Sequence, residues 1–298
     1  MNYETFKTST VNSIQKYFGD KASVSLQSIT KNNNIRMDGL IIQDSSINIA
    51  PTIYLNYYYE DYLAGKPLPA VWDAIIASYQ DNLPKNNMDL SFFTDYNKVK
   101  YQIIYKLVNY GQNAGLLKDV PHFRYLDLAV VFCCYLSDAP GGNASILIHN
   151  HHLDLWNVTA DTLYELAVKN TPILLPYELK SMEDTLKALC PDFPLASAAG
   201  APDHSSEMYV LSNTEKLYGA SAILYPDILS YFGKLSGCDF YILPSSIHEV
   251  LLLPKGPHSH ISDLNCIVRD VNGSQLLEEE ILSDHAYIYD RSLGFVTF

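Results

Sequence analysis

Residues 245–249, Ser-Ser-Ile-His-Glu, bring together the side chains of a hydrolytic site. Ser245 or Ser246 could act as a nucleophile and His248 as its base, with Glu249 beside them. Pro244 interrupts the apolar run before them, which predicts a turn or a strand edge at this point. The G-x-S-x-G elbow that exposes a nucleophilic serine is absent, and serines after proline are typical of turns. A hydrolase or transferase of unfamiliar type, with a site around Ser246, His248 and Glu249, is therefore the alternative function.

A second group of reactive side chains is the run His149-Asn150-His151-His152. If this run is extended, His149 and His151 point to one face and could share a metal ion, with Asp154 nearby. The other interpretation, which we favour, is a polar strand end that leads into a helix or turn at Leu153–Trp156. A contiguous run at a strand end cannot supply the spread geometry of a ββα-metal nuclease.

The common cofactor motifs are missing from the sequence. It contains no G-x-G-x-x-G, P-loop, H-E-x-x-H or EF-hand pattern. The local motifs that build common nucleotide, zinc-protease and calcium sites are therefore lacking. We therefore predict no cofactor and no metal, and the sequence leaves open whether the protein is an enzyme.

Tyrosine is the other unusual feature, with 23 in the chain. Five of them crowd into residues 54–62, and successive side chains of a helix or strand cannot all point inward. A tyrosine has a rigid apolar ring and a polar tip, which suits a surface that binds a protein partner. The predicted partner-binding residues are Tyr57, Tyr58, Tyr59 and Tyr62.

The charge distribution argues against nucleic-acid binding. The chain carries a net charge of −13, and residues 151–298 hold 8 basic and 20 acidic side chains against 12 and 13 in residues 1–150. An acidic surface repels phosphate backbones, and no cluster of Lys and Arg stands anywhere in the sequence. A basic protein partner or a cation fits the sign better, although solubility alone explains it more simply.

The remaining composition predicts a soluble cytoplasmic protein that does not enter a membrane. The first twenty residues lack the basic and apolar regions of a signal peptide, and no apolar run approaches eighteen residues. Five cysteines, including Cys133-Cys134 within an apolar run, are typical of reduced core thiols.

Hydrophobic periodicity predicts an α+β fold with mixed or antiparallel sheets and flanking helices. The clearest unit is 208–254, which is predicted as strand, helix, strand, turn and strand. Alternating runs at 23–29 and 35–42 predict a hairpin, and 69–82 has helical spacing with Val71, Ile75 and Tyr79 toward the core. Residues 190–207 are rich in proline and small side chains and are predicted to be a loop or linker. This divides the chain into an N-terminal α+β unit, 1–189, and a C-terminal α+β unit, 208–298.

Three long runs, at 98–132, 145–156 and 218–254, resemble a family of uncharacterised proteins from gut-dwelling Gram-positive bacteria. The resemblance covers nearly the whole chain and implies a bacterial, intracellular origin. That family is known as a domain of unknown function, so it implies no reaction, cofactor or catalytic residue. From this resemblance and the residues described above, we predict a noncatalytic intracellular binding or regulatory protein. The sequence supports no prediction of its oligomeric state.

Overall fold

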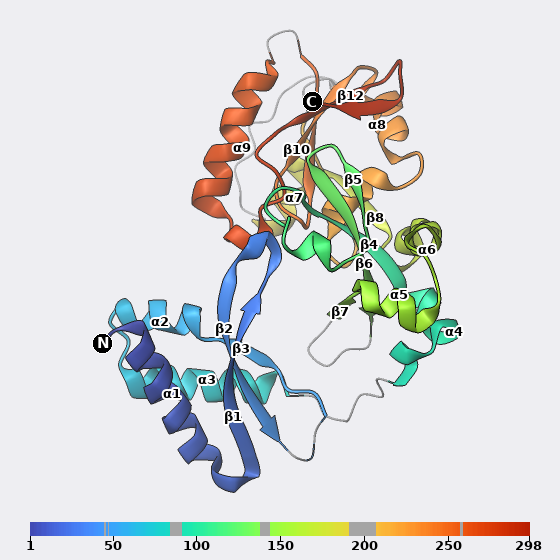
Figure 1. The fold of residues 1–298 in the computed structure, drawn as a ribbon. Helices are drawn as coiled ribbons and strands as arrows, with labels where there is room; N and C mark the ends of the chain where they lie inside the picture. Colours follow the sequence, from blue (N-terminus) through green and yellow to red (C-terminus); the bar gives the residue numbers. More distant parts are fainter. Residues whose placement is uncertain (45, 47, 84–90, 138–143, 191–206, 257–258) are drawn as a thin grey trace. The chain divides into compact units, whose positions relative to one another are not determined.

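The computed structural model of the protein describes residues 1–44, 46, 48–83, 91–137, 144–190, 207–256 and 259–298 (Figure 1). Its strands form antiparallel sheets and helices pack on them, which confirms the predicted α+β class. The chain forms two compact units. They are Met1–Phe93 with Leu136–Ala144 (unit 1) and Thr94–Tyr135 with Ser145–Phe298 (unit 2).

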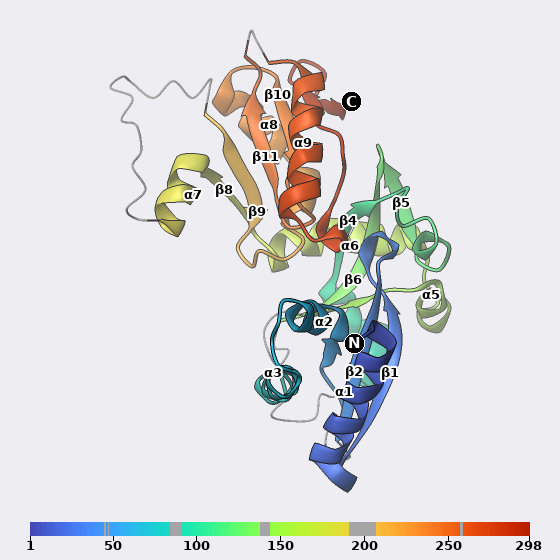
Figure 2. The ribbon, with the colours of Figure 1, turned by 90° about the vertical axis from the view of Figure 1, so that its left-hand side faces the viewer.

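Unit 1 has a three-stranded sheet in the order β1-β2-β3, and helices cover one side of it (Figure 2). The predicted hairpin is present, with Leu26 of β1 opposite Leu40 of β2. The buried core joins Leu40 and Ile42 to Phe6 of α1 and Ile75 of α3, as the helical spacing of α3 predicts. The elements are α1 (Tyr3–Phe18), β1 (Ala22–Thr30), β2 (Arg36–Asp44), β3 (Thr52–Tyr54), α2 (Leu55–Leu63) and α3 (Leu68–Asp81).

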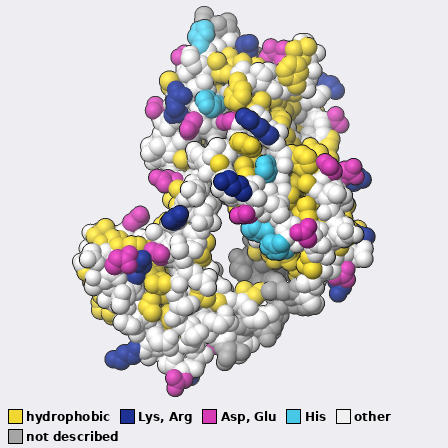
Figure 3. All heavy atoms as spheres, in the orientation of Figure 1, with side chains coloured by type: hydrophobic (Ala, Val, Ile, Leu, Met, Phe, Trp, Pro, Cys, Tyr) yellow, Lys and Arg dark blue, Asp and Glu magenta, His cyan; other side chains and the backbone are white. Residues whose placement is uncertain are grey.

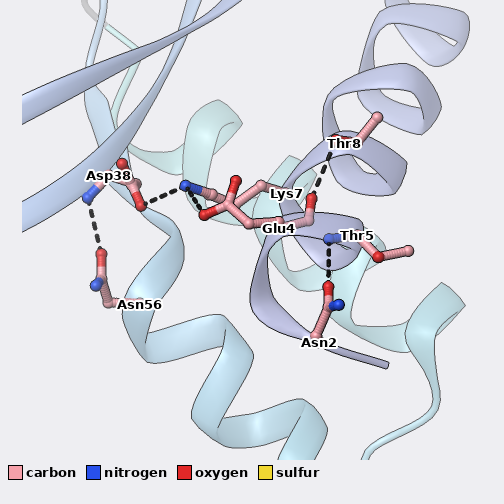
Figure 4. A network of polar contacts seen from close by, with 7 residues as sticks. All are labelled: Asn2, Glu4, Thr5, Lys7, Thr8, Asp38 and Asn56. Carbon is pink, nitrogen blue, oxygen red and sulfur yellow. Dashed lines mark hydrogen bonds and ion pairs between the residues drawn. The ribbon is translucent and has the colours of Figure 1, made fainter.

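A polar network fixes the start of α1 against β2 and α2 (Figure 4). The side chain of Asn2 accepts a backbone N–H of the first turn and so caps the helix. The ammonium of Lys7 lies 2.9 Å from Glu4 and 3.0 Å from Asp38 of β2. The backbone N–H of Asp38 donates in turn to the Asn56 side chain of α2 at 2.9 Å. Lys7 and Asp38 are mostly shielded from water, so their ion pair ties α1 to β2, and the Asn2 cap fixes where the helix starts.

The first sheet of unit 2 is built around β6, which pairs with β4, β5 and β7. Nearly all of β6 is buried, and α6 covers β4, where Thr171 accepts the backbone N–H of Tyr105 at 3.1 Å. The elements are α4 (Tyr96–Val99), β4 (Ile103–Asn109), β5 (His122–Tyr125), β6 (Leu128–Leu136), β7 (Ala144–Leu147), α5 (Asn150–Trp156) and α6 (Ala160–Leu174).

The second sheet of unit 2 has the strand order β13-β12-β10-β11-β9-β8. Successive residues of β10 point to opposite faces, so Tyr241 packs with Leu264 of α9 while Phe240 packs with Phe232 of α8, their rings 4.7 Å apart. The sheet therefore lies between these two helices. The elements are β8 (Tyr177–Ser181), α7 (Met182–Leu189), β9 (Tyr209–Asn213), α8 (Ile228–Ser236), β10 (Phe240–Pro244), β11 (Val250–Pro254), α9 (Ile261–Gln275), β12 (Tyr287–Asp290) and β13 (Phe295–Thr297).

The second sheet also spans the boundary that the sequence predicted. Strand β8 precedes the predicted linker and β9 follows it, yet the two strands pair over five positions from Tyr177↔Asn213 to Ser181↔Tyr209. Most of the predicted linker, 191–206, lies outside the described residues. The compact units thus follow a different division of the chain, in which residues 94–135 and 145–298 belong together. Among the described residues no helix is both long and apolar enough to cross a bilayer.

Candidate functional site

The predicted Ser245–Glu249 turn is present between β10 and β11, and its serines hold the turn closed. The backbone N–H of Ser246 donates to the carbonyl of Glu249 at 3.2 Å, and its side-chain oxygen accepts the backbone N–H of His248 at 3.0 Å. Ser245 donates to the Glu249 carboxylate at 3.2 Å. Among the described contacts neither hydroxyl bonds the His248 ring, so a serine nucleophile paired with its base is not formed here.

Glu249 lines a pocket of about 230 Å³, and the other charged side chains of this pocket form ion pairs with one another. Glu178 lies between two lysines of this pocket, with Lys180 at 2.6 Å and Lys216 in direct contact. Hydrogen bonds from Lys180 and Lys216 hold the pKa of Glu178 below its usual value. This pocket therefore offers a ligand little uncompensated charge.

The His248 ring points away from both serines, toward the loop that follows β9. Its Nδ1 lies 3.0 Å from the carbonyl oxygen of Lys216 and 3.3 Å from the backbone nitrogen of Tyr218. The backbone N–H of Tyr218 donates to Nδ1, and a neutral ring that accepts at Nδ1 carries its proton on Nε2. The ring also stacks on Tyr218, with centroids 5.9 Å apart and planes 13° apart.

The loop after β9 holds Tyr218 in a fixed and unusual conformation. Asn213, fully buried, closes the loop by donating to Leu217 O at 2.7 Å and accepting from Leu217 N at 3.2 Å. Tyr218 follows with φ 55°, a left-handed conformation that is costly for a tyrosine. The next residue must be Gly219, because a Cβ there would overlap the Ser212 hydroxyl and the His248 carbonyl. Backbone strain of this kind persists where the surrounding structure enforces it.

Tyr218 meets a lysine that lies on an apolar sheet face. Lys106 is the single charged residue of β4, and on its face of the sheet it stands between Ile104 and Val108 and opposite Val131 of β6. Its ammonium lies 4.3 Å from the centre of the Tyr218 ring. Among the described residues, no carboxylate lies within ion-pair distance of Lys106.

A hydroxyl and a thiol complete this group, which we call the Lys106 cluster: Lys106, Cys133, Ser145, Tyr218 and His248. The hydroxyls of Ser145 and Tyr218 are 3.0 Å apart. Burial raises the pKa of Cys133 although the Lys106 ammonium opposes this, so the side chain is a thiol at neutral pH. Burial disfavours the charged form of Lys106, but Cys133 and Tyr218 outweigh it, and the pKa of Lys106 lies above its usual value.

The extended alternative, in which His149 and His151 share one face of a strand, is not present, because His149 is the N-cap of α5 and His151 is in its first turn. The backbone N–H of His149 donates to Nδ1 of His152 at 2.9 Å, and this bond favours the helix. The centroids of the His149 and His151 rings are 5.6 Å apart. Burial, with repulsion from His151 and His149, lowers the pKa of His152 to about 4. Nowhere in the described chain are three or more His, Cys, Asp or Glu side chains placed to hold a metal ion.

The predicted tyrosine surface lies on α2 and is half-buried throughout. Tyr59 packs its ring 4.9 Å from Tyr3 and 5.2 Å from Phe6, and it belongs to the rim of the unit 1 core. Tyr57 lies on another side, with the Lys31 ammonium 5.8 Å from its ring. The members that pack against the core are Tyr58, Tyr59 and Tyr62. Binding of a partner by this helix stays a prediction.

Comparison with known proteins then places the chain in a family. Its residues 3–291 match the model of a family of unknown function, DUF5688. The chain belongs to DUF5688. Neither the functionally characterised proteins nor the solved structures contain a significant match to this DUF5688 chain. Fold and family therefore indicate no activity, and the function of this DUF5688 protein must be inferred from its candidate sites.

The residues that sequence reasoning missed are Lys106, Ser145 and Tyr218. The sequence does contain one signal, since Lys106 interrupts the apolar run Ile-Ile-Tyr-Lys-Leu-Val at 103–108. A lysine in a buried strand needs a partner or a function. Its neighbours come from β7 and from the loop after β9, and only the folded chain brings them together.

Proposed function

We propose that this protein is a noncatalytic binding protein whose Lys106 cluster holds a small anion, a carboxylate or a phosphate. The observation that carries the proposal is the ammonium of Lys106, which stands on an apolar sheet face with no carboxylate beside it among the described residues. A charge in such surroundings is costly unless a partner of opposite charge compensates it. An anionic ligand supplies that partner.

The neighbouring hydroxyls provide the second contact. Ser145 and Tyr218 share one hydrogen bond, so one of their two protons remains to be donated to the ligand. Hydrogen bonds from an ammonium and a hydroxyl to an anionic oxygen are among the stronger polar contacts in proteins. The enforced backbone of Tyr218 keeps this donor in place before the ligand arrives, which lowers the entropic cost of binding.

The contacts of His248 favour binding over catalysis. Its ring stacks on the face of Tyr218, and the Tyr218 hydroxyl bonds Ser145. The imidazole and the phenol thus lie face to face instead of forming a proton relay through the hydroxyl. A proton-transfer step would need a different arrangement of these two rings.

The setting we propose is the cytoplasm of a bacterium. All five cysteines are free thiols, and Cys133 and Cys134 are buried, which fits a reducing compartment. A protein partner that docks on the α2 tyrosines would make the anion site regulatory, with ligand binding and partner binding on one chain.

The test compares wild-type protein with Lys106→Met, which keeps the aliphatic stem and removes the charge. Unfolding temperature is measured in inorganic phosphate, in acetate and in chloride at equal ionic strength. We expect phosphate or acetate to stabilise the wild type beyond chloride, by about 1.4 kcal/mol at ten times Kd. Lys106→Met should lose this difference between the anions.

The matched control is Lys234→Met, which removes an exposed lysine of α8. It should respond to phosphate and acetate as the wild type does. An equal anion response in Lys106→Met and wild type would refute the site. If Lys106→Met is poorly folded, Ser145→Ala serves as the second variant and should weaken the same response.

A further inference from the structure

A second pocket of unit 2, with a volume of about 370 Å³, lies where the ends of β4 and β5 meet the loop before β12. Pockets of this size are at the lower end of the range for small-molecule sites, which is about 300–1,000 Å³. Unlike the pocket beside Glu249, it is lined by charges that do not pair with one another. Its charged and titratable lining residues are Arg124, Asp127, Asp284 and His285.

Arg124 is held in place by contacts that leave the end of its side chain available. Its guanidinium lies 4.7 Å above the ring of Tyr110, and its Nε donates to the carbonyl of Leu126 at 3.0 Å. Leu126 has φ 56°, so the turn that offers this carbonyl is tightly defined. Within the described chain the guanidinium has no carboxylate within 4.0 Å, and its terminal nitrogens can meet a carboxylate in the two-pronged manner that arginine favours.

Two carboxylates face the same pocket, and both are oriented by other side chains. Asp127 accepts hydroxyl protons from Ser283 at 2.6 Å and from Tyr287 at 2.7 Å. One oxygen of Asp284 accepts from the Asn272 amide at 2.8 Å. These bonds involve no cation, so both negative charges remain uncompensated by the described part of the protein. Asp284 keeps its second oxygen for a ligand.

A pocket with one guanidinium and two carboxylates that do not pair selects a ligand that carries both signs. We propose that this pocket binds a free amino acid, with the α-carboxylate on Arg124 and amino groups on Asp284 and Asp127. The charges of Arg124, Asp127 and Asp284 sum to −1, so a basic amino acid, whose net charge is +1, matches best. Neutral amino acids bind more weakly because one carboxylate then lacks a partner.

The site is independent of the anion site proposed at Lys106. None of the lining residues of this pocket belongs to the Lys106 cluster, and the ligand differs in class. Lys106→Met should therefore leave amino-acid binding unchanged. Failure of one proposal leaves the other standing.

Calorimetric titration with L-lysine, cadaverine and hexanoate tests the inference. Cadaverine lacks the α-carboxylate of lysine, and hexanoate lacks both amines. We expect L-lysine to bind at least tenfold more tightly than either, and more tightly than L-alanine. Binding of L-lysine no tighter than that of cadaverine and hexanoate, or no binding at all, would overturn the proposal.

Two variants, each of which removes one charge, separate the carboxylate contact of the ligand from its amine contacts. Arg124→Gln should weaken L-lysine at least tenfold and leave cadaverine unchanged, whereas Asp284→Asn should weaken both amines. Asn at 284 can still accept from Asn272, so the loop should keep its structure. Arg269→Gln, an exposed arginine of α9, is the control and should bind as the wild type does. If Arg124→Gln binds L-lysine as tightly as Arg269→Gln does, the assignment of the carboxylate is wrong.

Discussion

Tyr105 and Tyr225 meet edge to face in unit 2 with their rings 6.2 Å apart, but their hydroxyls differ. Tyr225 donates to the carbonyl of Leu175 at 2.8 Å. The hydroxyl of Tyr105 is buried and has no hydrogen-bond partner among the described residues, and burial raises the pKa of both phenols. A buried hydroxyl without a partner loses its hydration and gains nothing in return, so it lowers stability.

The two phenols give a matched pair of predictions at the residue scale. Tyr105→Phe should raise the free energy of unfolding by about 1 kcal/mol, because the change removes an unsatisfied group. Tyr225→Phe should lower it by about 1–2 kcal/mol, because it leaves the Leu175 carbonyl without its donor. Urea unfolding followed by circular dichroism measures both. Equal destabilisation by the two changes would mean that the Tyr105 hydroxyl has a partner in solution.

At the scale of elements, regular hydrophobic spacing predicted the hairpin of β1 and β2, the strands β9, β10 and β11, and helix α3. Prediction failed where tertiary contacts outweigh local signals. An Asn-Gly pair such as Asn272-Gly273 favours a helix end. Helix α9 nevertheless continues to Gln275, because buried Asn272 donates to Ser283 O at 3.0 Å and to Asp284 at 2.8 Å. These bonds offset the roughly 1 kcal/mol that glycine costs inside a helix.

The sites were less predictable than the elements. The turn at Ser245–Glu249 was predicted from proline and serine, and the structure has it. The Lys106 cluster was not predicted, since Lys106 on β4 and Tyr218 after β9 are distant in sequence and meet only through folding. A pattern within one segment carries no information about which other segment will lie against it.

Helix α2 supports a prediction about its tyrosines. Tyr59→Ala should lower the free energy of unfolding by about 3 kcal/mol, because its ring packs against Tyr3 and Phe6. Tyr57→Ala should cost about 1 kcal/mol or less, since this ring lies over Lys31 and outside the apolar core. Chemical denaturation of the two variants checks the difference. Equal and large losses would show that the whole helix is core, and the partner-binding prediction would lose its support.

On the scale of the whole molecule, charge is the dominant property. The chain carries a net charge of −13, and basic side chains on the face drawn in Figure 3 are scattered among acidic and uncharged ones. One ammonium suffices for a small anion such as phosphate. Nucleic acids need several cations along a groove or stripe, because affinity comes from the release of many counterions.

We therefore expect no binding of random-sequence duplex or single-stranded nucleic acid at physiological salt. Mobility-shift titrations up to about 1 µM protein should show free nucleic acid throughout, since even nonspecific binders with basic surfaces reach only about 10⁻⁴–10⁻⁶ M. Inorganic phosphate at the Lys106 cluster is the positive control for anion binding. A submicromolar shift that weakens with added salt would contradict this expectation.

The core of unit 1 is made by side chains from Tyr3 to Leu83 alone, and this has a consequence for synthesis. A ribosome adds about 5–20 residues per second, so the roughly 200 residues between Leu83 and strand β13 take about 10–40 s to appear. The N-terminal core can close during that time. The six-stranded sheet cannot, because its edge strand β13 is synthesised after the other strands of that sheet. The nascent chain thus has a folded N-terminal core and unpaired apolar strands until β13 has emerged, and this interval is when the protein most needs a chaperone.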